Sequence, residues 1–167
     1  LLIITQSLVI IKKKETEGFP MEIERKFIVS EPPENLQDYP YHEIEQGYLC
    51  MDPVIRIRRM DKQYFLTFKS RGLLSRTECE FPLDKKAYEH LLPKIDGILI
   101  QKTRYKIPEK HGYVIELDVF HDVHEGLIMA EVEFPSEEAA LDYEGPEWLG
   151  DEVTFDARYQ NNNLANR

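Results

Sequence analysis

The sequence contains little cysteine, and this scarcity limits the class of protein. Only two cysteines, Cys50 and Cys79, occur among its 167 residues. They give neither a disulfide framework nor the CxxC spacing of a structural metal site. Because free thiols persist in reducing compartments, we expect two incidental thiols and a cytoplasmic protein.

An excess of basic charge is also absent. Acidic residues outnumber basic ones by 31 to 21, and the net charge is −10. A protein that binds nucleic acid usually presents a basic surface, so we expect no nucleic-acid partner. This balance still allows a small basic site inside an acidic shell.

Long apolar runs are missing as well. Residues 1–11 are mostly apolar, but a helix that spans a bilayer needs about 20 apolar residues. Three lysines follow this run, whereas the basic residues of a secretory signal precede its apolar run. The first methionine is Met21. We therefore interpret residues 1–20 as a leader or extension, and residues 21–167 as a single functional domain with no membrane partner.

The chain also lacks the GxGxxG and GxxxxGK[ST] patterns and any clear Ser/His/Asp arrangement. What it has instead is charge that alternates with apolar residues. Neighbouring side chains of a strand point to opposite faces, so Glu22, Glu24 and Lys26 share one face. Ile23 and Phe27 lie on the other face. One such stretch suits a solvated surface as well as a hydrated cavity, but the pattern recurs along the chain.

This recurrence predicts about eight strands joined mostly by short turns, which favours an antiparallel sheet. The expected strands are residues 22–29, 44–51, 54–60, 63–70, 75–81, 98–107, 113–120 and 127–134. Two helices are expected at 85–95 and 137–143, with Asp84 and Ser136 as their N-caps. The apolar faces of these helices must pack on the apolar side of the sheet.

The alternating charges gather by sign on different strands. The basic members are Lys26, Arg56, Arg58, Lys69, Arg76, Lys102 and Arg104. The acidic members are Glu22, Glu24, Glu78, Glu80, Glu116, Asp118, Glu131 and Glu133. An open sheet with one face toward water would explain any single strand. The whole set instead suits a sheet that closes into a barrel around a wet, doubly charged lumen.

The chemistry of such a lumen is restricted. Arginine forks bind phosphate oxygens, and lysine adds point charge. Clusters of carboxylates hold Mg²⁺ or Mn²⁺, which prefer oxygen ligands. Together these groups indicate a site for a polyphosphate that is bridged to divalent metal.

Residues 22–27, Glu-Ile-Glu-Arg-Lys-Phe, match the ExExK signature of the CYTH, or triphosphate tunnel metalloenzyme, superfamily. Further blocks resemble this family in the expected order, at residues 46–49, 55–58, 66–69, 102–105, 116–120 and 130–134. The tail around Trp148, Arg158 and Tyr159 resembles the small bacterial inorganic tripolyphosphatases. The resemblance covers about residues 21–167. It implies an α+β fold, an eight-stranded antiparallel closed β-barrel or tunnel with a few helices packed outside.

The resemblance also implies roles for the inward charges. Divalent metal, Mg²⁺ or Mn²⁺, would be held by Glu22, Glu24, Glu131 and Glu133, with Glu116 and Asp118 as further candidates. Triphosphate would be gripped by Lys26, Arg56, Arg58, Lys69, Arg76, Lys102 and Arg104. Lys102 and Tyr48 would lie near the scissile bond and assist water attack or leaving-group departure. Glu78 and Glu80 would orient the basic residues.

The implied function is metal-dependent hydrolysis of tripolyphosphate to pyrophosphate and phosphate, and the outer surface of the barrel is free to form a homodimer. Three alternatives stay open. A class IV-type adenylate cyclase needs a purine site, to which we can assign no segment. A thiamine triphosphatase needs room for an organic tail. A non-enzymatic module would bind polyphosphate or an organic triphosphate, but it would gain nothing from the many carboxylates unless metal bridged them.

Overall fold

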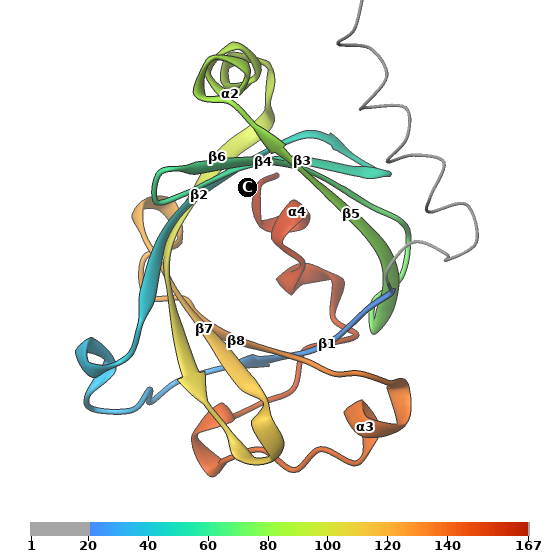
Figure 1. The fold of residues 1–167 in the computed structure, drawn as a ribbon. Coiled ribbons are helices and arrows are strands. Elements are labelled where there is room, and N and C mark those ends of the chain that lie inside the picture. The colour runs from blue at the N-terminus through green and yellow to red at the C-terminus, as the bar shows by residue number, and fades with distance from the viewer. Residues whose placement is uncertain (1–20, 167) are drawn as a thin grey trace, which may run out of the picture.

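The computed structural model describes residues 21–166, and these fold around a closed barrel of eight antiparallel strands (Figure 1). The strands are β1 (Met21–Ile28), β2 (Tyr41–Met51), β3 (Val54–Met60), β4 (Gln63–Lys69), β5 (Ser75–Leu83), β6 (Asp96–Pro108), β7 (Val114–Phe120) and β8 (Ile128–Glu133). Around the barrel their order is β1-β5-β4-β3-β2-β6-β7-β8. Antiparallel pairing of β8 with β1 closes the ring. The predicted closed barrel is therefore confirmed.

The main apolar core lies outside this barrel rather than inside it. Ile23 and Phe27 of β1 pack there with Leu117 of β7 and Val132 of β8. The short helix α3 (Glu137–Leu141) contributes its buried Ala140 to this core. Because the outer face holds the apolar side chains, the alternate positions of the same strands point charged groups into the barrel.

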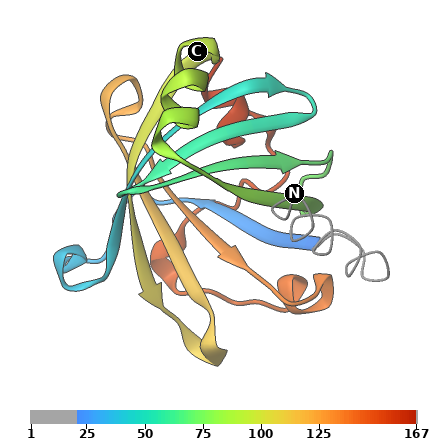
Figure 2. The same cartoon turned by 45° about the horizontal axis from the view of Figure 1, so that its top comes forward.

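Helix α2 (Lys85–Leu91) covers a second part of the outer surface, near β3 and β4 (Figures 1 and 2). Its buried Tyr88 ring lies 5.0 Å from the Tyr64 ring. As predicted, the Asp84 side chain caps this helix by accepting a hydrogen bond from the amide of Ala87.

Both predicted helices are shorter than the sequence pattern suggested. The first was expected over residues 85–95, but it becomes a 3₁₀ turn, η2 (Leu92–Lys94), after Leu91. Pro93 explains this change, because proline lacks the N–H group that would continue the α-helical ladder. The second was expected over residues 137–143 and ends at Leu141. The predicted cap at Ser136 is confirmed by its hydrogen bond from the Ala139 amide.

The remaining elements are single turns of helix. They are η1 (Leu36–Asp38), η3 (Lys110–Gly112), η4 (Asp122–His124), η5 (Glu147–Leu149), η6 (Ala157–Tyr159) and α4 (Asn161–Leu164). Viewed along the barrel, α4 lies within the ring of strands (Figure 1). Within residues 21–166, no helix is long and apolar enough to cross a membrane. The predicted leader, residues 1–20, lies outside the described residues, so that interpretation stays a prediction.

Candidate active site

The barrel contains a cavity of about 770 Å³, and half of the residues that line it are charged. Among the described residues, seven carboxylates line it, those of Glu22, Glu24, Glu78, Glu80, Glu116, Glu131 and Glu133. Seven cationic side chains line it as well, those of Lys26, Arg56, Arg58, Lys69, Arg76, Arg104 and Lys106. The wall therefore carries both signs in equal number.

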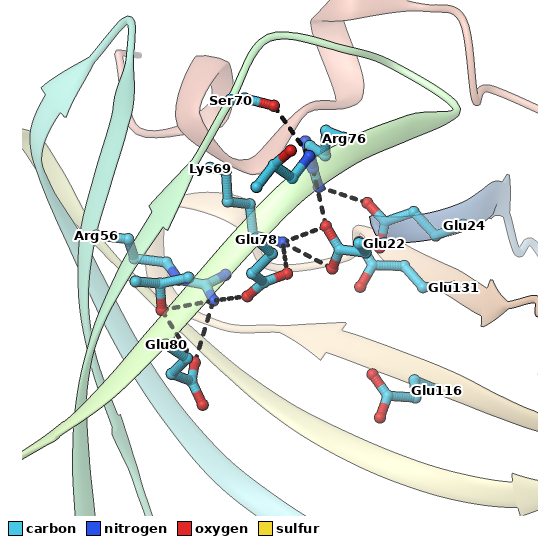
Figure 3. A network of polar contacts seen from close by, with 12 residues as sticks. Glu22, Glu24, Arg56, Lys69, Ser70, Arg76, Glu78, Glu80, Glu116 and Glu131 are labelled. Carbon is cyan, nitrogen blue, oxygen red and sulfur yellow. Dashed lines mark hydrogen bonds and ion pairs between the residues drawn. The ribbon is translucent and has the colours of Figure 1, made fainter. Parts of the chain in front are cut away.

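Strands β1, β4 and β5 bring one group of these charges together (Figure 3). The Glu22 carboxylate accepts hydrogen bonds from the Lys69 ammonium at 2.8 Å and from Arg76 Nε at 2.9 Å. Arg76 also reaches Glu24 at 2.6 Å. Burial lowers the pKa of Arg76, but the carboxylates of Glu24 and Glu22 more than offset this effect and raise the pKa above its usual value. Arg76 thus stays charged inside the barrel.

A second group joins β1, β6 and β8 around Glu131. The Glu131 carboxylate bonds the Lys26 ammonium on one side and Arg104, at 2.6 Å, on the other. Burial raises the pKa of Glu131, but Lys26 and Arg104 more than offset it, so the pKa lies well below its usual range. Burial likewise lowers the pKa of Lys26, and Glu131 and Glu24 reverse that shift and raise it. These groups therefore form a buried network of ionised side chains.

The third group lies on β3 and β5. Arg58 donates to Glu80 at 2.5 Å, and Arg56 lies 3.6 Å from Glu78. This arrangement fits the prediction that Glu78 and Glu80 orient basic residues. Among the described residues, the buried Nε atoms of both arginines have no hydrogen-bond partner. Because a buried donor without an acceptor is unfavourable, these two atoms indicate that an oxygen-rich ligand belongs beside them.

Glu133 differs from the other carboxylates of the wall. Burial raises its pKa, and the nearby carboxylates of Glu22 and Glu116 raise it further. Yet within residues 21–166 no three His, Cys, Asp or Glu side chains are already grouped to hold a metal. Apart from Glu133, the carboxylates predicted as ligands turn toward neighbouring cations instead, as Glu24 does toward Lys26 at 2.7 Å. Metal binding would require them to exchange these partners.

The two residues expected near the scissile bond have different surroundings. Tyr48 lines the cavity, and its hydroxyl accepts a hydrogen bond from Gln46 Nε2 at 2.9 Å. Burial raises the pKa of Tyr48 to about 12, so its hydroxyl keeps its proton. Lys102 is not part of the lining, and its ammonium bonds Asp118, at 2.5 Å. Burial lowers the pKa of Lys102 to about 8, against the attraction of Asp118.

Several lining residues were not singled out from the sequence. They include Gln46, the three amides Gln160, Asn161 and Asn162, and Lys106, which shares a strand face with Lys102 and Arg104 but was given no role. Gln46 and Lys106 share the inward face of strands whose other inward residues were identified, so alternation alone could have found them. The amides come from the polar tail, where no periodic signal indicated that the chain enters the barrel.

Comparison with known proteins agrees with this architecture. The model of the CYTH domain matches residues 20–167. An inorganic triphosphatase of Nitrosomonas europaea is 44% identical over 150 residues, covering 86% of this chain and 96% of the relative. A second inorganic triphosphatase, from Acetivibrio thermocellus, is 36% identical over 149 residues, which are 86% of this chain and 92% of that protein.

A solved structure gives the same result in three dimensions. The crystal structure of the inorganic triphosphatase NE1496 superposes with a TM-score of 0.66 at 39% identity. The match covers 87% of this chain and 95% of that structure. The chain belongs to the CYTH domain family.

Proposed function

We propose that this protein hydrolyses inorganic triphosphate to pyrophosphate and phosphate inside its barrel, with Mg²⁺ or Mn²⁺ as cofactor. The observation that carries the proposal is the cavity inside the barrel, which seven carboxylates and seven cationic side chains line. The relatives in Nitrosomonas and Acetivibrio, both named inorganic triphosphatases, support the choice of substrate.

The balance of charge in the cavity explains why metal belongs to this proposal. A site that only bound a polyanion would be expected to carry an excess of positive charge. Here the carboxylates of the wall offset its cations in number, so a triphosphate would bring several uncompensated negative charges. Divalent ions that enter with the substrate would supply the missing positive charge.

The cationic residues would hold the phosphate chain. Arginine forks and lysine ammonium groups match phosphate oxygens, and the unpartnered Nε atoms of Arg56 and Arg58 are donors that such oxygens would satisfy. The full proposed set is Lys26, Arg56, Arg58, Lys69, Arg76, Lys102 and Arg104. Of these, Lys102 would first have to leave Asp118.

The carboxylates would hold the metal. Carboxylate oxygens are the ligands that Mg²⁺ and Mn²⁺ prefer, so the chemistry of the donor set fits these ions. The proposed ligands are Glu22, Glu24, Glu131 and Glu133, with Glu116 and Asp118 as further candidates. When bound, the metal would offset phosphate charge and orient the chain for in-line attack.

The reaction adds one water across a phosphoanhydride bond. The water oxygen bonds a phosphorus at one end of the chain, the bridging P–O bond breaks, and its electron pair leaves with pyrophosphate. One proton of the water passes to a phosphate oxygen of the products. The Tyr48 hydroxyl, which keeps its proton, would donate a hydrogen bond to an oxygen at this centre. Lys102, on the inward face of β6, would assist water attack or leaving-group departure once its ammonium had left Asp118.

Two other enzymatic functions use the same kind of substrate. An adenylate cyclase would need a purine site, and a thiamine triphosphatase would need space for an organic tail. A binding module without turnover would gain nothing from so many inward carboxylates unless metal bridged them to the ligand. We therefore regard inorganic triphosphate as the substrate that the cavity supports best.

The test is phosphate release from tripolyphosphate, ATP and thiamine triphosphate, each with Mg²⁺, with Mn²⁺ and with chelator. Cyclic AMP formation from ATP would be measured in the same samples. Metal-dependent release from tripolyphosphate that greatly exceeds release from the others is the expected result. Preference for an organic triphosphate, or cyclic AMP formation, would overturn the assignment, as would tight binding without turnover.

A further inference from the structure

The Tyr48 side chain lies between an apolar and a charged environment. Its ring packs in a cluster that includes Ile100, Phe120 and Met129, and the residue is only 2% exposed. Tyr48 also lines the charged cavity. The packed ring fixes the position of the hydroxyl oxygen, but the O–H bond can still rotate about the C–O bond. The hydrogen-bond partners of this oxygen therefore decide where its proton points.

Gln46 is one of these partners. It precedes Tyr48 by two residues in β2, so both side chains lie on the inward face of the strand. Gln46 is 1% exposed, and its Nε2 atom donates to the Tyr48 hydroxyl oxygen at 2.9 Å. This bond occupies one lone pair of the oxygen, so the O–H group must point elsewhere. Within residues 21–166 the Tyr48 hydroxyl donates to no side chain or carbonyl group, and its proton is available to a ligand.

The backbone of β2 is irregular where these two residues lie. Its register with β6 shifts between Gln46 and Tyr48, and its register with β3 shifts between Tyr48 and Cys50. Such irregularities bend a strand and change the direction of its side chains. Gly47 lies between the pair on the outward face, where a Cβ atom would be 2.7 Å from Cγ2 of Ile95. Close packing behind the strand therefore supports the placement of both side chains.

Two arginines lie directly across from this pair on the neighbouring strand. Tyr48 is the partner of Arg56, and Gln46 is the partner of Arg58, in the antiparallel pairing of β2 with β3. The Cβ atoms of such partners lie about 5 Å apart. The Nε atoms of the two arginines are the unpartnered donors described above. A phosphate oxygen that accepted from either arginine would thus lie on the same part of the wall as the Tyr48 hydroxyl.

We propose that Gln46 is a positioning residue, which directs the Tyr48 hydroxyl proton toward a phosphate oxygen held by Arg56 and Arg58. A hydrogen bond that a hydroxyl oxygen accepts strengthens the bond that the same hydroxyl donates. Gln46 would therefore also strengthen the contact of Tyr48 with an oxygen that gains negative charge as the anhydride bond breaks. This inference rests on the proposed function, because it assigns a supporting contact to a residue of the proposed catalytic site.

A double-mutant cycle tests whether Gln46 acts through Tyr48. Gln46 also lines the cavity, so direct contact with phosphate is the competing explanation. Gln46→Met keeps an unbranched side chain of similar length but removes the donor, and Tyr48→Phe removes the hydroxyl. Gln46→Met should lower kcat about tenfold with little change in KM, yet lower it by less than about twofold in the Tyr48→Phe background. Equal losses in both backgrounds, or a rise in KM that persists in Tyr48→Phe, would overturn the positioning role.

Gln101→Met is the matched control, because Gln101 is exposed on β6 and its side-chain amide bonds Asp122. It should leave kcat unchanged in both backgrounds. If Gln46→Met does not fold, Gln46→Glu keeps the shape of the side chain and replaces the donor by an acceptor. Its carboxylate would accept the Tyr48 proton, so kcat should fall at least about tenfold, and by much less in the Tyr48→Phe background. Equal losses would again overturn the role of Gln46.

NMR of protein labelled with ¹³C at the tyrosine Cζ atoms gives a readout that does not need turnover. The Tyr48 signal is the one that Tyr48→Phe lacks. Saturating tripolyphosphate, added with chelator to prevent turnover, should shift this signal in the wild type and in Gln101→Met. The shift should be much smaller in Gln46→Met, because the hydroxyl would no longer be directed toward the phosphate. An equal shift in Gln46→Met would contradict the proposal.

Failure of this inference can be told from failure of the proposed function. Independent losses in the double-mutant cycle would overturn the role of Gln46 even if tripolyphosphate is hydrolysed rapidly. Absence of turnover would overturn the proposed function, and the NMR comparison would still decide whether Gln46 directs the Tyr48 hydroxyl toward a bound phosphate.

Discussion

Replacement of Glu24 by glutamine should strengthen the binding of tripolyphosphate without metal and slow the metal-dependent release of phosphate. Glu24 is 7% exposed, and its carboxylate lies 2.7 Å from the Lys26 ammonium and 2.6 Å from Arg76. A phosphate that uses these two cations must therefore compete with the carboxylate. Glutamine keeps the shape of the side chain and removes the competing charge.

The magnitude follows from Coulomb's law. Two unit charges about 4 Å apart interact by about 4 kcal/mol at an effective dielectric constant of about 20. If water and salt in the open cavity screen about half of this repulsion, about 2 kcal/mol remains, which is about thirtyfold in a dissociation constant. We therefore expect Glu24→Gln to bind tripolyphosphate about thirtyfold more tightly than the wild type when metal is chelated.

Turnover should respond in the other direction, because the same carboxylate is a proposed metal ligand. Phosphate release by Glu24→Gln should be at least about tenfold slower at a fixed Mg²⁺ concentration, and half-activation should need more Mg²⁺. Calorimetry with chelator measures the first effect, and a Mg²⁺ titration of phosphate release measures the second. Glu138→Gln is the control, since Glu138 is exposed on α3 and changes the net charge equally. Unchanged metal-free binding together with an unchanged Mg²⁺ requirement would refute the reasoning.

Four further outcomes are expected. Arg56→Ala should raise KM for tripolyphosphate about tenfold or more with a smaller change in kcat, and steady-state kinetics would contradict the phosphate assignment if KM stayed constant. Leu164→Ala should lower the free energy of unfolding by about 3 kcal/mol in urea titrations, since a buried side chain is truncated. A loss below about 1 kcal/mol would show that Leu164 of α4 is not packed inside the barrel. The hydrogen bond from Arg25 lowers the pKa of Glu152 below its ordinary 4.5, so this pair stabilises the fold above that pH and the stabilisation is lost as pH falls through the lower folded-state pKa. Glu152→Gln should therefore be less stable by up to about 1 kcal/mol at pH 7, and urea titration near pH 3 should show a smaller difference, whereas an equal difference at both values would contradict the linkage. Removal of residues 1–20 should leave turnover and folding intact, and loss of either would show that these residues belong to the domain.

The strands could be predicted because their signal is local. A strand has a fixed period of two, so Glu22, Glu24 and Lys26 had to share a face wherever the strand was placed. Closure of the barrel needed two more arguments, that the charges gather by sign on different strands and that the apolar faces of two helices require an apolar surface. The structure meets this expectation through an outer core that includes Phe27 and Ala140.

The partners of the charges could not be predicted in the same way. Sorting the inward side chains by the sign of their charge suggested one set that binds phosphate and a separate set that binds metal. In the structure the two sets are paired, because Glu131 bonds both Lys26 and Arg104. Likewise Lys102 pairs with Asp118 instead of lining the cavity. The contact of Glu131 with Lys26 depends on the register between β1 and β8, which are distant in sequence, and no local pattern encodes it.

The path of the C-terminal segment was missed for a related reason. Residues 160–163 read as a polar tail, and Ile100 and Phe120 read as ordinary strand residues. Only the tertiary arrangement shows that these apolar side chains line the inside of the barrel and receive Leu164. Gly97 is the local signal of this path, because a side chain there would meet the carbonyl oxygen of Ala165. A glycine at the end of the preceding helix is, however, expected for the helix terminus alone.

The placement of the apolar core outside the barrel has a consequence for how such proteins diversify. Alternate residues of each strand have separate roles: the outward side chains stabilise the fold, and the inward side chains contact the ligand. In β1, Ile23 and Phe27 pack in the outer core, whereas Glu22, Glu24 and Lys26 line the cavity. A substitution on one face leaves the side chains of the other in place, so selection can rewrite the chemistry of the interior while the same eight strands persist.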